Sequence, residues 1–585
     1  MRLSISKSKN STSLYVIKST YKSGSTSSKV VEKLGTVESL REKLNGEDPI
    51  EWAEKYVEQL NQQEKEQKRE VIVKYSPVKI IPKDERRVFN GGYLFLQKIY
   101  HELGLDKICN TISGRHKFEF DLNSILSRLV YGRIIFPSSK LSTFQLSENF
   151  IEQPNFEIQH IYRSLGVIAK ETDFIQAELY KNSLKRYKRR TGVIYYDCTN
   201  YFFEIEQEEG LRQYGLSKEN KPNPIVGMGM FMDADGIPLA FAIHKGNTNE
   251  QITMTPLEQK ILSDFNLSKF VVCTDAGLAS TGNRKFNDRG DRAFITTQSI
   301  KKLKAHLKKW ALEQDGWRLC FDPKICGMTK LEEEEERKKR YDITKLDEEK
   351  DRNKIYYRER WINEDGLEQK LIVTYSIKYR DYQRKIRASQ IERAKKLIKT
   401  NPTKLKKANQ NDYKRFIAKT NCTNDGEIAE NEIYSINMDV IAGEEMFDGF
   451  YGVCTNLEDS AAEIVKVNSR RWEIEECFRI MKSEFKARPV YLGRDDRIEA
   501  HFTTCFIALM VYRFLEKKLE EKFTCHEIID GLRSMNFYEL KGEGYIPAYT
   551  RTDFTDALHD AYGFRTDYQI VNLRQMKNIF KDTKN

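Results

Sequence analysis

Two aspartates lie where strands are expected, and their side chains are of a type that can hold metal ions. Asp197 lies in the middle of VIYYDCTNYFFEIE at 193–206, a run rich in β-branched and aromatic residues, and Asp275 follows the apolar residues of FVVCTDAG at 270–277. Carboxylates are depleted from buried strands because an unpaired buried charge is costly. Each aspartate therefore needs a partner, often a cation, unless it caps a turn or a following helix.

A third acidic residue, Glu475, lies in NSRRWEIEECFRIMKSE at 468–484. Arg471, Glu475 and Lys482 are spaced by four and then seven residues, so on a helix they share a face, with Lys482 roughly 10 Å beyond Glu475. An ordinary surface pair between Arg471 and Glu475 explains this spacing when it is considered alone. Together with the two aspartates, however, the helix forms a set of three carboxylates and two cations. The helix itself is predicted by an apolar stripe of Ile464, Val467, Ile474, Phe478, Met481 and Phe485.

These residues resemble the catalytic DDE triad of bacterial insertion-sequence transposases, which have a ribonuclease-H-like core. Arg471-x3-Glu475-x6-Lys482 is similar to the Y-x2-R-x3-E-x6-K motif of that family, although Asn468 stands where the motif has tyrosine. The DAG that begins at Asp275 and the GN-x2-E of Gly246–Glu250 also fit. The resemblance covers roughly residues 190–515.

The resemblance implies a DNA transposase with Asp197, Asp275 and Glu475 as catalytic metal ligands. Two divalent ions about 4 Å apart can activate a nucleophile and stabilise the leaving oxygen of a phosphodiester. Oxygen ligands favour Mg²⁺, with Mn²⁺ as a substitute. We expect metal-dependent cleavage at the element ends, followed by transfer of the 3′-OH into target DNA, with Arg471 and Lys482 contacting phosphates.

The expected partners are the terminal inverted repeats and the target DNA, held by a homodimer assembled on DNA. No interaction with a membrane is expected. Two alternatives stay open. One is a ribonuclease-H-like nuclease that cuts but does not join, and the other is a domesticated DNA-binding protein with an idle metal site.

The elements that must position these residues follow the ribonuclease-H-like order. Three strands, 193–206, IVGMGMFMD and GIPLAFAIHKGN, are joined by turns and predict an antiparallel meander. A helix then leads to a strand at 270–275, expected to run parallel to the first, and to a further strand at 292–299. Asp275 and Glu475 are 200 residues apart, far more than one crossover needs, so an insertion separates them.

The predicted fold class is a multi-domain α/β protein with a mixed-sheet ribonuclease-H-like core, an α+β insertion and a helical N-terminal region. The expected domains are an N-terminal hairpin with a charged helix (1–90), a helical DNA-binding region (91–190), the first part of the core (191–300), the insertion (301–445), the second part of the core (446–523) and a C-terminal tail (524–585). An apolar helix is expected at 499–523, packed against the core.

Two further features suggest contacts with nucleic acid. A basic cluster precedes the first core strand, where phosphate contact competes with an ordinary solvated helix end. Aromatic residues alternate with basic ones in the insertion, where Trp361 is a candidate for DNA contact, while packing of a small β core is the competing interpretation. The basic cluster consists of Lys185, Arg186, Lys188, Arg189 and Arg190.

Composition restricts the remaining possibilities. The 585-residue chain is too long for one core, and a formal charge of +11 permits a polyanionic partner without requiring one. No apolar run approaches the length of a membrane span, and the N-terminus lacks the apolar core of a secretory signal. The ten cysteines include no C-x2-C pair, which favours reduced, buried thiols and a cytoplasmic setting. The family resemblance implies that this cytoplasm is bacterial and that the protein acts on the nucleoid.

Overall fold

The computed structural model describes the chain except for residues 9–10, 23–24, 45–46, 68–69, 74, 322–334, 336–337, 401–411 and 423–427. The chain divides into two compact units, Met1–Glu85 and Arg86–Asn585. Most of the charge run at 331–341 and part of the basic segment that follows residue 400 lie outside the described residues.

The first unit is a three-stranded antiparallel sheet with two helices. Strands β1 (Arg2–Lys7), β2 (Thr12–Lys22) and β3 (Ser25–Thr36) are followed by α1 (Val37–Lys43) and α2 (Pro49–Gln67). The predicted hairpin and charged helix are therefore present, and β1 adds a strand that the sequence analysis did not expect. Leu14, Leu40 and Ala53 form the small core of this unit.

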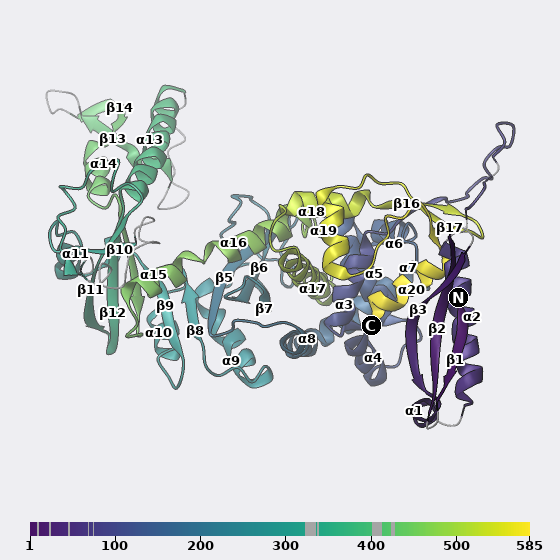
Figure 1. The fold of residues 1–585 in the computed structure, drawn as a ribbon. Helices are drawn as coiled ribbons and strands as arrows, with labels where there is room; N and C mark the ends of the chain where they lie inside the picture. The colour runs from purple at the N-terminus through teal and green to yellow at the C-terminus, as the bar shows by residue number, and fades with distance from the viewer. Residues whose placement is uncertain are drawn as a thin grey trace. The chain divides into compact units, whose positions relative to one another are not determined.

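The second unit contains a nine-stranded mixed sheet with the ribonuclease-H-like strand order (Figure 1). Strands β5 (Val193–Phe202), β6 (Ile225–Asp233) and β7 (Pro238–Lys245) form the predicted meander. Helix α9 (Met254–Asp264) leads to β8 (Val271–Thr274), which is parallel to β5, and β9 (Ala293–Gln298) is parallel to β8. The order β9-β8-β5-β6-β7 confirms the predicted fold class.

Three strands of the insertion extend this sheet. Strands β10 (Arg318–Phe321), β11 (Ile355–Glu364) and β12 (Leu367–Tyr375) continue it beyond β15 (Phe450–Thr455), which pairs with β9, and all these pairings are antiparallel. Trp317 and Tyr356 are fully buried in the core beside these strands. These two aromatic residues therefore pack a β core, as the competing interpretation held.

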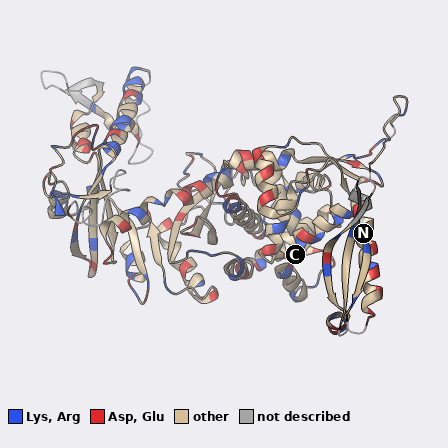
Figure 2. Cartoon of the chain, in the orientation of Figure 1, with Lys and Arg blue, Asp and Glu red and all other residues tan. Residues whose placement is uncertain are grey.

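The helical part of the insertion begins after β12. It contains α13 (Ile377–Thr400), the hairpin of β13 (Ile417–Cys422) and β14 (Ile428–Ile436), and α14 (Met438–Glu445). Lys and Arg residues recur along α13 (Figure 2). One of them, Arg387, is buried and paired with Asp448, so not every cation of this helix faces solvent.

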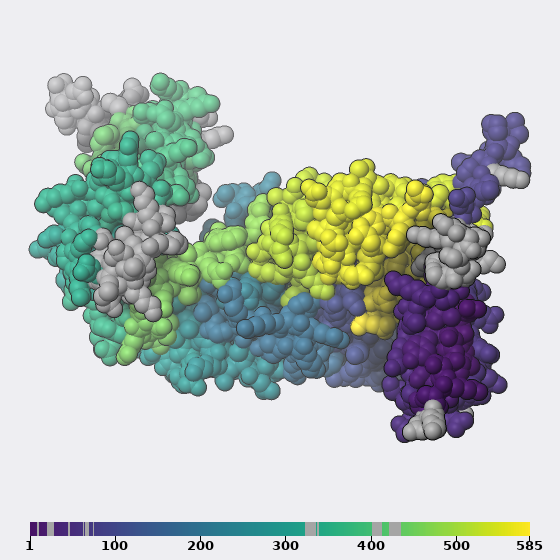
Figure 3. All heavy atoms as spheres, in the orientation of Figure 1, coloured from purple at the N-terminus to yellow at the C-terminus, as the bar shows by residue number. Residues whose placement is uncertain are grey.

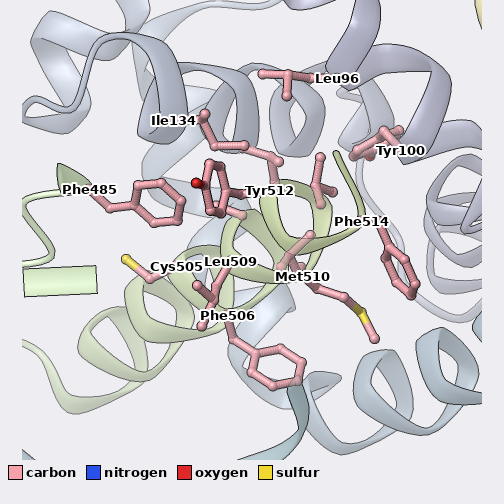
Figure 4. Close-up of a cluster of buried hydrophobic side chains, with 14 of the residues drawn as sticks. Leu96, Tyr100, Ile134, Phe485, Cys505, Phe506, Leu509, Met510, Tyr512 and Phe514 are labelled. Atoms are coloured by element: carbon pink, nitrogen blue, oxygen red, sulfur yellow. The ribbon is translucent and has the colours of Figure 1, made fainter. Parts of the chain in front are cut away.

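The helical region has α17 (Asp495–Lys518) at its centre, although this helix lies over 300 residues further along the chain. It packs against α3 (Tyr93–Glu102), α5 (Leu122–Ile135), α7 (Ile158–Lys170) and also β7, so one core joins the helices to the sheet (Figure 4). By length and composition α17 could cross a membrane, contrary to our expectation of no such run, but 94% of its apolar window is buried inside the protein. The remaining helices of this region are α4 (Leu105–Arg115), α6 (Lys140–Ser147) and α8 (Thr172–Arg186).

The C-terminal segment is part of this helical region and not a loose tail. Helix α18 (Cys525–Ser534) packs on α5, and α20 (Leu573–Lys584) packs on α3. The strands β16 (Asn536–Leu540), β17 (Gly544–Pro547) and β18 (Val571–Asn572) form a sheet with β4 (Val88–Asn90), and α19 (Asp553–Tyr562) lies between them in the chain. The yellow C-terminal atoms accordingly lie against blue atoms from the first half of this unit (Figure 3).

Candidate active site

Asp197 and Asp275 lie side by side on neighbouring parallel strands. The pairing of β5 with β8 aligns Val193 with Val271 and Tyr195 with Cys273, and continuing this register by two residues aligns Asp197 with Asp275. Adjacent strands are about 4.8 Å apart. The two carboxylates that are 78 positions apart in the sequence are therefore neighbours at the end of β8.

Both aspartates belong to the sheet face that the motif helices cover. Alternate residues of a strand point to opposite faces. Tyr195 of β5 donates a hydrogen bond to the Val467 carbonyl (2.9 Å), and Cys273 of β8 contacts the Asn468 side chain (3.8 Å). Asp197 and Asp275 each follow two residues later on the same face. Continuing the β8–β9 register adds Thr297, which completes a row of three polar residues across the sheet.

Burial raises the pKa of Asp197 to about 6; the Lys218 ammonium opposes this rise, and the nearby Asp275 carboxylate adds to it. Oδ1 of Asp197 accepts a hydrogen bond from its neighbour's amide, Cys198 N–H (2.7 Å), and Oδ1 of Asp275 accepts from Gly277 and Leu278 (3.0 Å each). Among the described residues no hydrogen bond occupies Oδ2 of either aspartate. Two adjacent carboxylates with free oxygens are a suitable arrangement for a divalent cation.

The predicted motif helix is divided into three segments. Helix α15 (Ala461–Ser469) ends before Arg471, α16 (Trp472–Arg479) carries Glu475, and a π-helical turn, η5 (Ile480–Glu484), carries Lys482. The hydrogen bond from Phe485 N–H to the Ile480 carbonyl (2.9 Å) has the five-residue spacing of a π-turn. The predicted apolar stripe is confirmed, since all its members are buried except the half-buried Val467.

Glu475 lies along the same strand as Asp197. Tyr195 contacts Val467 at one end of β5, and Tyr201 contacts Met481 (4.0 Å) at the other. Between these contacts the strand rises about 20 Å and the helix about 21 Å, so the two run parallel. Glu475 is exposed on α16 and lies roughly one helical turn beyond the level of Asp197.

A hydrogen-bonded chain that the sequence analysis missed links Arg471 to the polar row. Arg471 Nη1 donates to Thr297 Oγ1 (3.1 Å), which shares a hydrogen bond with the Tyr451 hydroxyl (2.7 Å). Asn468 Nδ2 donates to the same hydroxyl (3.1 Å). Tyr451 comes from β15, outside the motif. It contacts Asn468, which stands where the motif has tyrosine. Only the strand-like run around Tyr451 was visible in the sequence.

On an unbroken helix, Lys482 would lie on the same face as Arg471 and Glu475, but in the structure it lies in the π-turn and contacts other residues. Its ammonium pairs with Glu219 (3.3 Å), as does Arg488 (3.4 Å), and it lies over the Tyr201 ring (5.4 Å). Burial lowers the pKa of Lys482. The extra residue of the π-turn changes the direction of side chains after Arg479, which the sequence spacing could not reveal.

Lys218 and Glu250 also lie beside Asp197. They form an ion pair (3.1 Å), and Lys218 donates to the Cys198 carbonyl (2.5 Å). Both line a cavity of about 530 Å³ that runs along β5 next to the aspartates, together with His244, which is thus a strand residue at a cavity wall. Glu250 was noted in the sequence as part of GN-x2-E, whereas Lys218 lies in a loop without a recognisable pattern.

The basic cluster at the end of α8 is not uniform. The prediction of a DNA contact is wrong for Arg189, because its guanidinium is 1% exposed, pairs with buried Asp233 (2.7 Å) and donates to the carbonyls of Ile237 and Pro238. Arg190 pairs with Asp235 at the surface. Lys185, Arg186 and Lys188 are exposed and stay candidates. Trp361 on β11 is 43% exposed, with Lys370 over its ring (5.5 Å), and also stays a candidate.

The carboxylate oxygens of Asp197, Asp275 and Glu475 do not all lie within 4.8 Å of one another. In the described part of the chain, the one group of three possible ligand residues with atoms within 4.8 Å of one another is Asp556, His559 and Asp567. Arg551 and Arg565 pair with these two aspartates (2.6 Å each), so their charges are already compensated. Asp197 and Asp275 form no ion pair with an arginine of the described residues and are the better fit for a cation, while Glu475 lies on the helix that covers β5.

The strand order and the row of polar residues define a ribonuclease-H-like protein with an acidic site at the ends of its parallel strands. Residues 217–511, just over half of the chain, match the family model described as the transposase DDE domain. The chain belongs to this transposase family, and it is therefore a DNA transposase. The match includes Asp275 and Glu475 but begins after Asp197, whose placement beside Asp275 comes from the structure alone.

Other comparisons add little to this assignment. No curated protein matches the sequence. Among solved structures, one match is the cryo-EM structure of a piggyBac transposase synaptic complex with hairpin DNA, at 8% sequence identity and a TM-score of 0.34. The match covers 84% of this chain and 85% of that chain. The fold assignment rests on the strand order, and the family assignment rests on the sequence match.

Proposed function

We propose that this transposase serves an insertion sequence, cleaving DNA at the element ends and joining the freed 3′-OH to target DNA. The observation that supports this proposal is the alignment of Asp197 with Asp275 on the sheet face beneath α16. The proposed partners are duplex DNA carrying the terminal inverted repeats and the target duplex, bound by a homodimer in the bacterial cytoplasm.

Asp197, Asp275 and Glu475 are the proposed ligands of two Mg²⁺ ions, with Mn²⁺ as a substitute. When bound, such ions supply activation of the attacking water or 3′-OH and stabilisation of the leaving oxygen. The protein's own contribution is positional. Asp197 and Asp275 are held by backbone N–H donors, and the helix that carries Glu475 is anchored by the burial of Ile474 and Phe478.

Arg471 and Lys482 have different proposed roles. Arg471 lies at the row of polar residues, where its guanidinium can contact a non-bridging oxygen of the scissile phosphate while Thr297 and Tyr451 hold its orientation. Lys482 is paired with Glu219 in the free protein, so a DNA phosphate must compete with that carboxylate for it. We therefore assign Lys482 to DNA further from the cleaved bond than Arg471.

The first prediction tests the acidic residues. Asp197→Asn, Asp275→Asn and Glu475→Gln should each reduce cleavage at element ends by at least about 10³-fold, while DNA affinity stays close to wild type because it comes from basic residues. Cleavage and binding are measured separately, with Mg²⁺, with Mn²⁺ and with a chelator. Cleavage near the wild-type rate by any of the three variants would contradict the assignment.

Matched controls separate charge loss from loss of the site. Glu476→Gln changes the neighbouring carboxylate, which pairs with Arg479, and Asp264→Asn changes an exposed aspartate at the end of α9. Both should cleave as wild type does. A strand-transfer assay with pre-cut ends then distinguishes a transposase that joins DNA from a nuclease that only cuts.

A further inference from the structure

A small cavity lies in the helical region and is lined by none of Asp197, Asp275 and Glu475. It has a volume of about 40 Å³ and is enclosed by α5, α6, α7, α17 and the segment that follows η5. This is room for roughly three or four water-sized groups, which matches the four oxygens of a tetrahedral oxyanion. Tyr491, which is 72% exposed, stands at its edge, so the cavity is accessible from solvent. Arg133, Ser138, Ser139, Lys140 and His501 supply its polar lining.

Lys140 is the unusual member of this lining because it is a lysine that is only 5% exposed. Its ammonium contacts Nδ1 of His501 (3.2 Å), whose Nε2 faces the Ala487 carbonyl (2.9 Å). This places the imidazole proton on Nε2 and leaves Nδ1 as the acceptor. No carboxylate oxygen among the described residues lies within 4.0 Å of the lysine nitrogen. Burial lowers the pKa of Lys140 to about 7.

A comparison with the other buried lysine shows what Lys140 lacks. Among the described residues only Lys140 and Lys370 are buried lysines. The ammonium of Lys370 donates to the carbonyls of Glu458 and Asp459 (2.9 Å each). The Lys140 ammonium contacts one neutral ring nitrogen, that of His501, and no other acceptor among the described residues, so two of its three N–H donors are unused. A buried cation with unused donors is costly unless an anion or another acceptor is supplied.

Two more groups make the same cavity electropositive. Arg133 is 4% exposed, donates to the carbonyls of Phe485, Lys486 and Ser138, and has a buried Nε without an acceptor. Lys140 is also the first residue of α6, whose N-cap Ser139 satisfies the N–H of Ser142 only. The first N–H groups of a helix lack intrahelical partners, and this end of a helix favours anions.

We propose that this cavity is a binding site for a phosphate-type oxyanion, held by Lys140, Arg133 and the N-terminus of α6. The anion would accept hydrogen bonds from the unused donors of Lys140 and balance two buried cations for which the described residues provide no acidic side chain. A DNA backbone phosphate and free inorganic phosphate share this chemistry. None of the residues of this site is a proposed metal ligand, so the test with inorganic phosphate does not depend on the proposed cleavage reaction.

The second prediction concerns inorganic phosphate alone. Thermal unfolding of the full-length protein is followed in increasing sodium phosphate, with sodium chloride at the same ionic strength as the reference and sulfate as a second oxyanion. We expect a saturable rise in Tm on the order of a few degrees with phosphate and sulfate relative to chloride. Equal Tm values in phosphate and chloride, with DNA affinity unchanged in the variant below, would overturn the proposal.

Lys140→Met keeps the length of the side chain and removes its charge, so the rise in Tm caused by phosphate should disappear. Lys140→Gln serves the same purpose if the first variant does not fold. Lys370→Met is the matched control: it removes a buried lysine outside the cavity, and the phosphate-dependent rise should persist even if the starting Tm changes. A Lys140 variant that keeps the full response would show that phosphate binds elsewhere.

The source of the phosphate is decided by DNA binding. If the natural ligand is a backbone phosphate, Lys140→Met should weaken binding to duplex DNA and lower the log–log salt slope by about one, and inorganic phosphate should compete with DNA in the wild type. If the ligand is free phosphate, DNA affinity should be the same in both proteins while only the wild type gains Tm from phosphate. Either result supports the oxyanion site.

Discussion

At the scale of residues, the polar row beneath α16 depends on a tyrosine that the motif does not contain. Asn468 stands where related sequences have tyrosine, yet the Tyr451 hydroxyl lies between Asn468 and Thr297 (3.1 and 2.7 Å). Thr297 in turn accepts from Arg471. We interpret Tyr451 as a positioning residue that acts through Arg471, since its hydroxyl is hydrogen-bonded to Thr297, which accepts the hydrogen bond from Arg471.

The third prediction tests this interpretation. Tyr451→Phe removes one hydroxyl, and because a hydrogen bond contributes about 1 kcal/mol, cleavage should fall roughly three- to tenfold, with Tm and DNA affinity close to wild type. In an Arg471→Ala background the same substitution should have little further effect, because the residue through which it acts is gone. Independent, multiplicative losses in the double variant would refute the link.

The exposed Tyr568, between α19 and β18, provides the control for removing a hydroxyl. Tyr568→Phe should leave the cleavage rate unchanged, because its side chain is 49% exposed and belongs neither to the motif helices nor to the sheet that carries the aspartates.

At the scale of elements, the connection between α8 and β5 combines two kinds of cation in one short basic run. Lys185 and Arg186 end α8 and are exposed, whereas Arg189 turns inward to Asp233 at the end of β6. Asp233 also accepts from the N–H groups of Asp235 and Ile237, so the ion pair fixes the β6–β7 turn. Arg189 thus joins the helical region to the sheet.

The fourth prediction follows from this pairing. Arg189→Met should lower the free energy of unfolding by about 3–5 kcal/mol, because it leaves the Asp233 carboxylate buried without its cation. Arg186→Met, three residues earlier, should change stability by no more than about 0.5 kcal/mol. Urea unfolding of both variants gives the comparison. Similar midpoints for the two would mean that the buried pair does not stabilise the fold.

The direction of the side chains on the motif helix also depends on the conformation of the surrounding backbone. Its apolar stripe is continuous across α15, α16 and η5, but the backbone is divided, and the π-turn directs Lys482 to Glu219. A single seven-residue spacing in sequence therefore does not give one continuous charged face. Arg471 and Glu475 precede the π-turn, so the extra residue of that turn does not change the spacing between them.

At the scale of the whole molecule, the two units have very different cores. The first unit has a core of Leu14, Leu40 and Ala53, whereas the second has an extensive core around α17 that joins the helices to the sheet. The C-terminal helices α18 and α20 complete that core by packing on α5 and α3. The second unit therefore needs its own C-terminal segment to bury the helices near its N-terminal end.

The fifth prediction is that residues 86–585 fold without residues 1–85. The shortened chain should unfold cooperatively with a Tm within a few degrees of the full-length protein, measured by circular dichroism, because its core is complete. The matching control removes the C-terminal segment from residue 524, which should greatly destabilise the chain by exposing the faces of α3 and α5. A stable chain that lacks the C-terminal segment, or an unfolded chain of residues 86–585, would contradict this account.

Much of this protein follows from local patterns in its sequence. Period-2 and apolar runs predicted the strands β5 to β9, and the spacing of three and four predicted the buried stripe of the motif helices, because these features depend on neighbouring residues only. The order of the strands in the sheet was expected from the ribonuclease-H-like pattern instead. The two aspartates could be selected because a carboxylate in a strand is unusual. The family follows from the same residues, and the sequence match over 217–511 supports it.

Tertiary structure decided which of these residues meet. The alignment of Asp197 with Asp275 is a matter of strand register, and the inward turn of Arg189 depends on an aspartate 44 residues away. The contact of Tyr451 with Asn468, the place of α17 among earlier helices and the pairing of Lys140 with His501 all join distant segments. Local sequence sets the preference of each segment for helix or strand, but a side chain's partner and charge state depend on burial, which is a property of the whole packed chain.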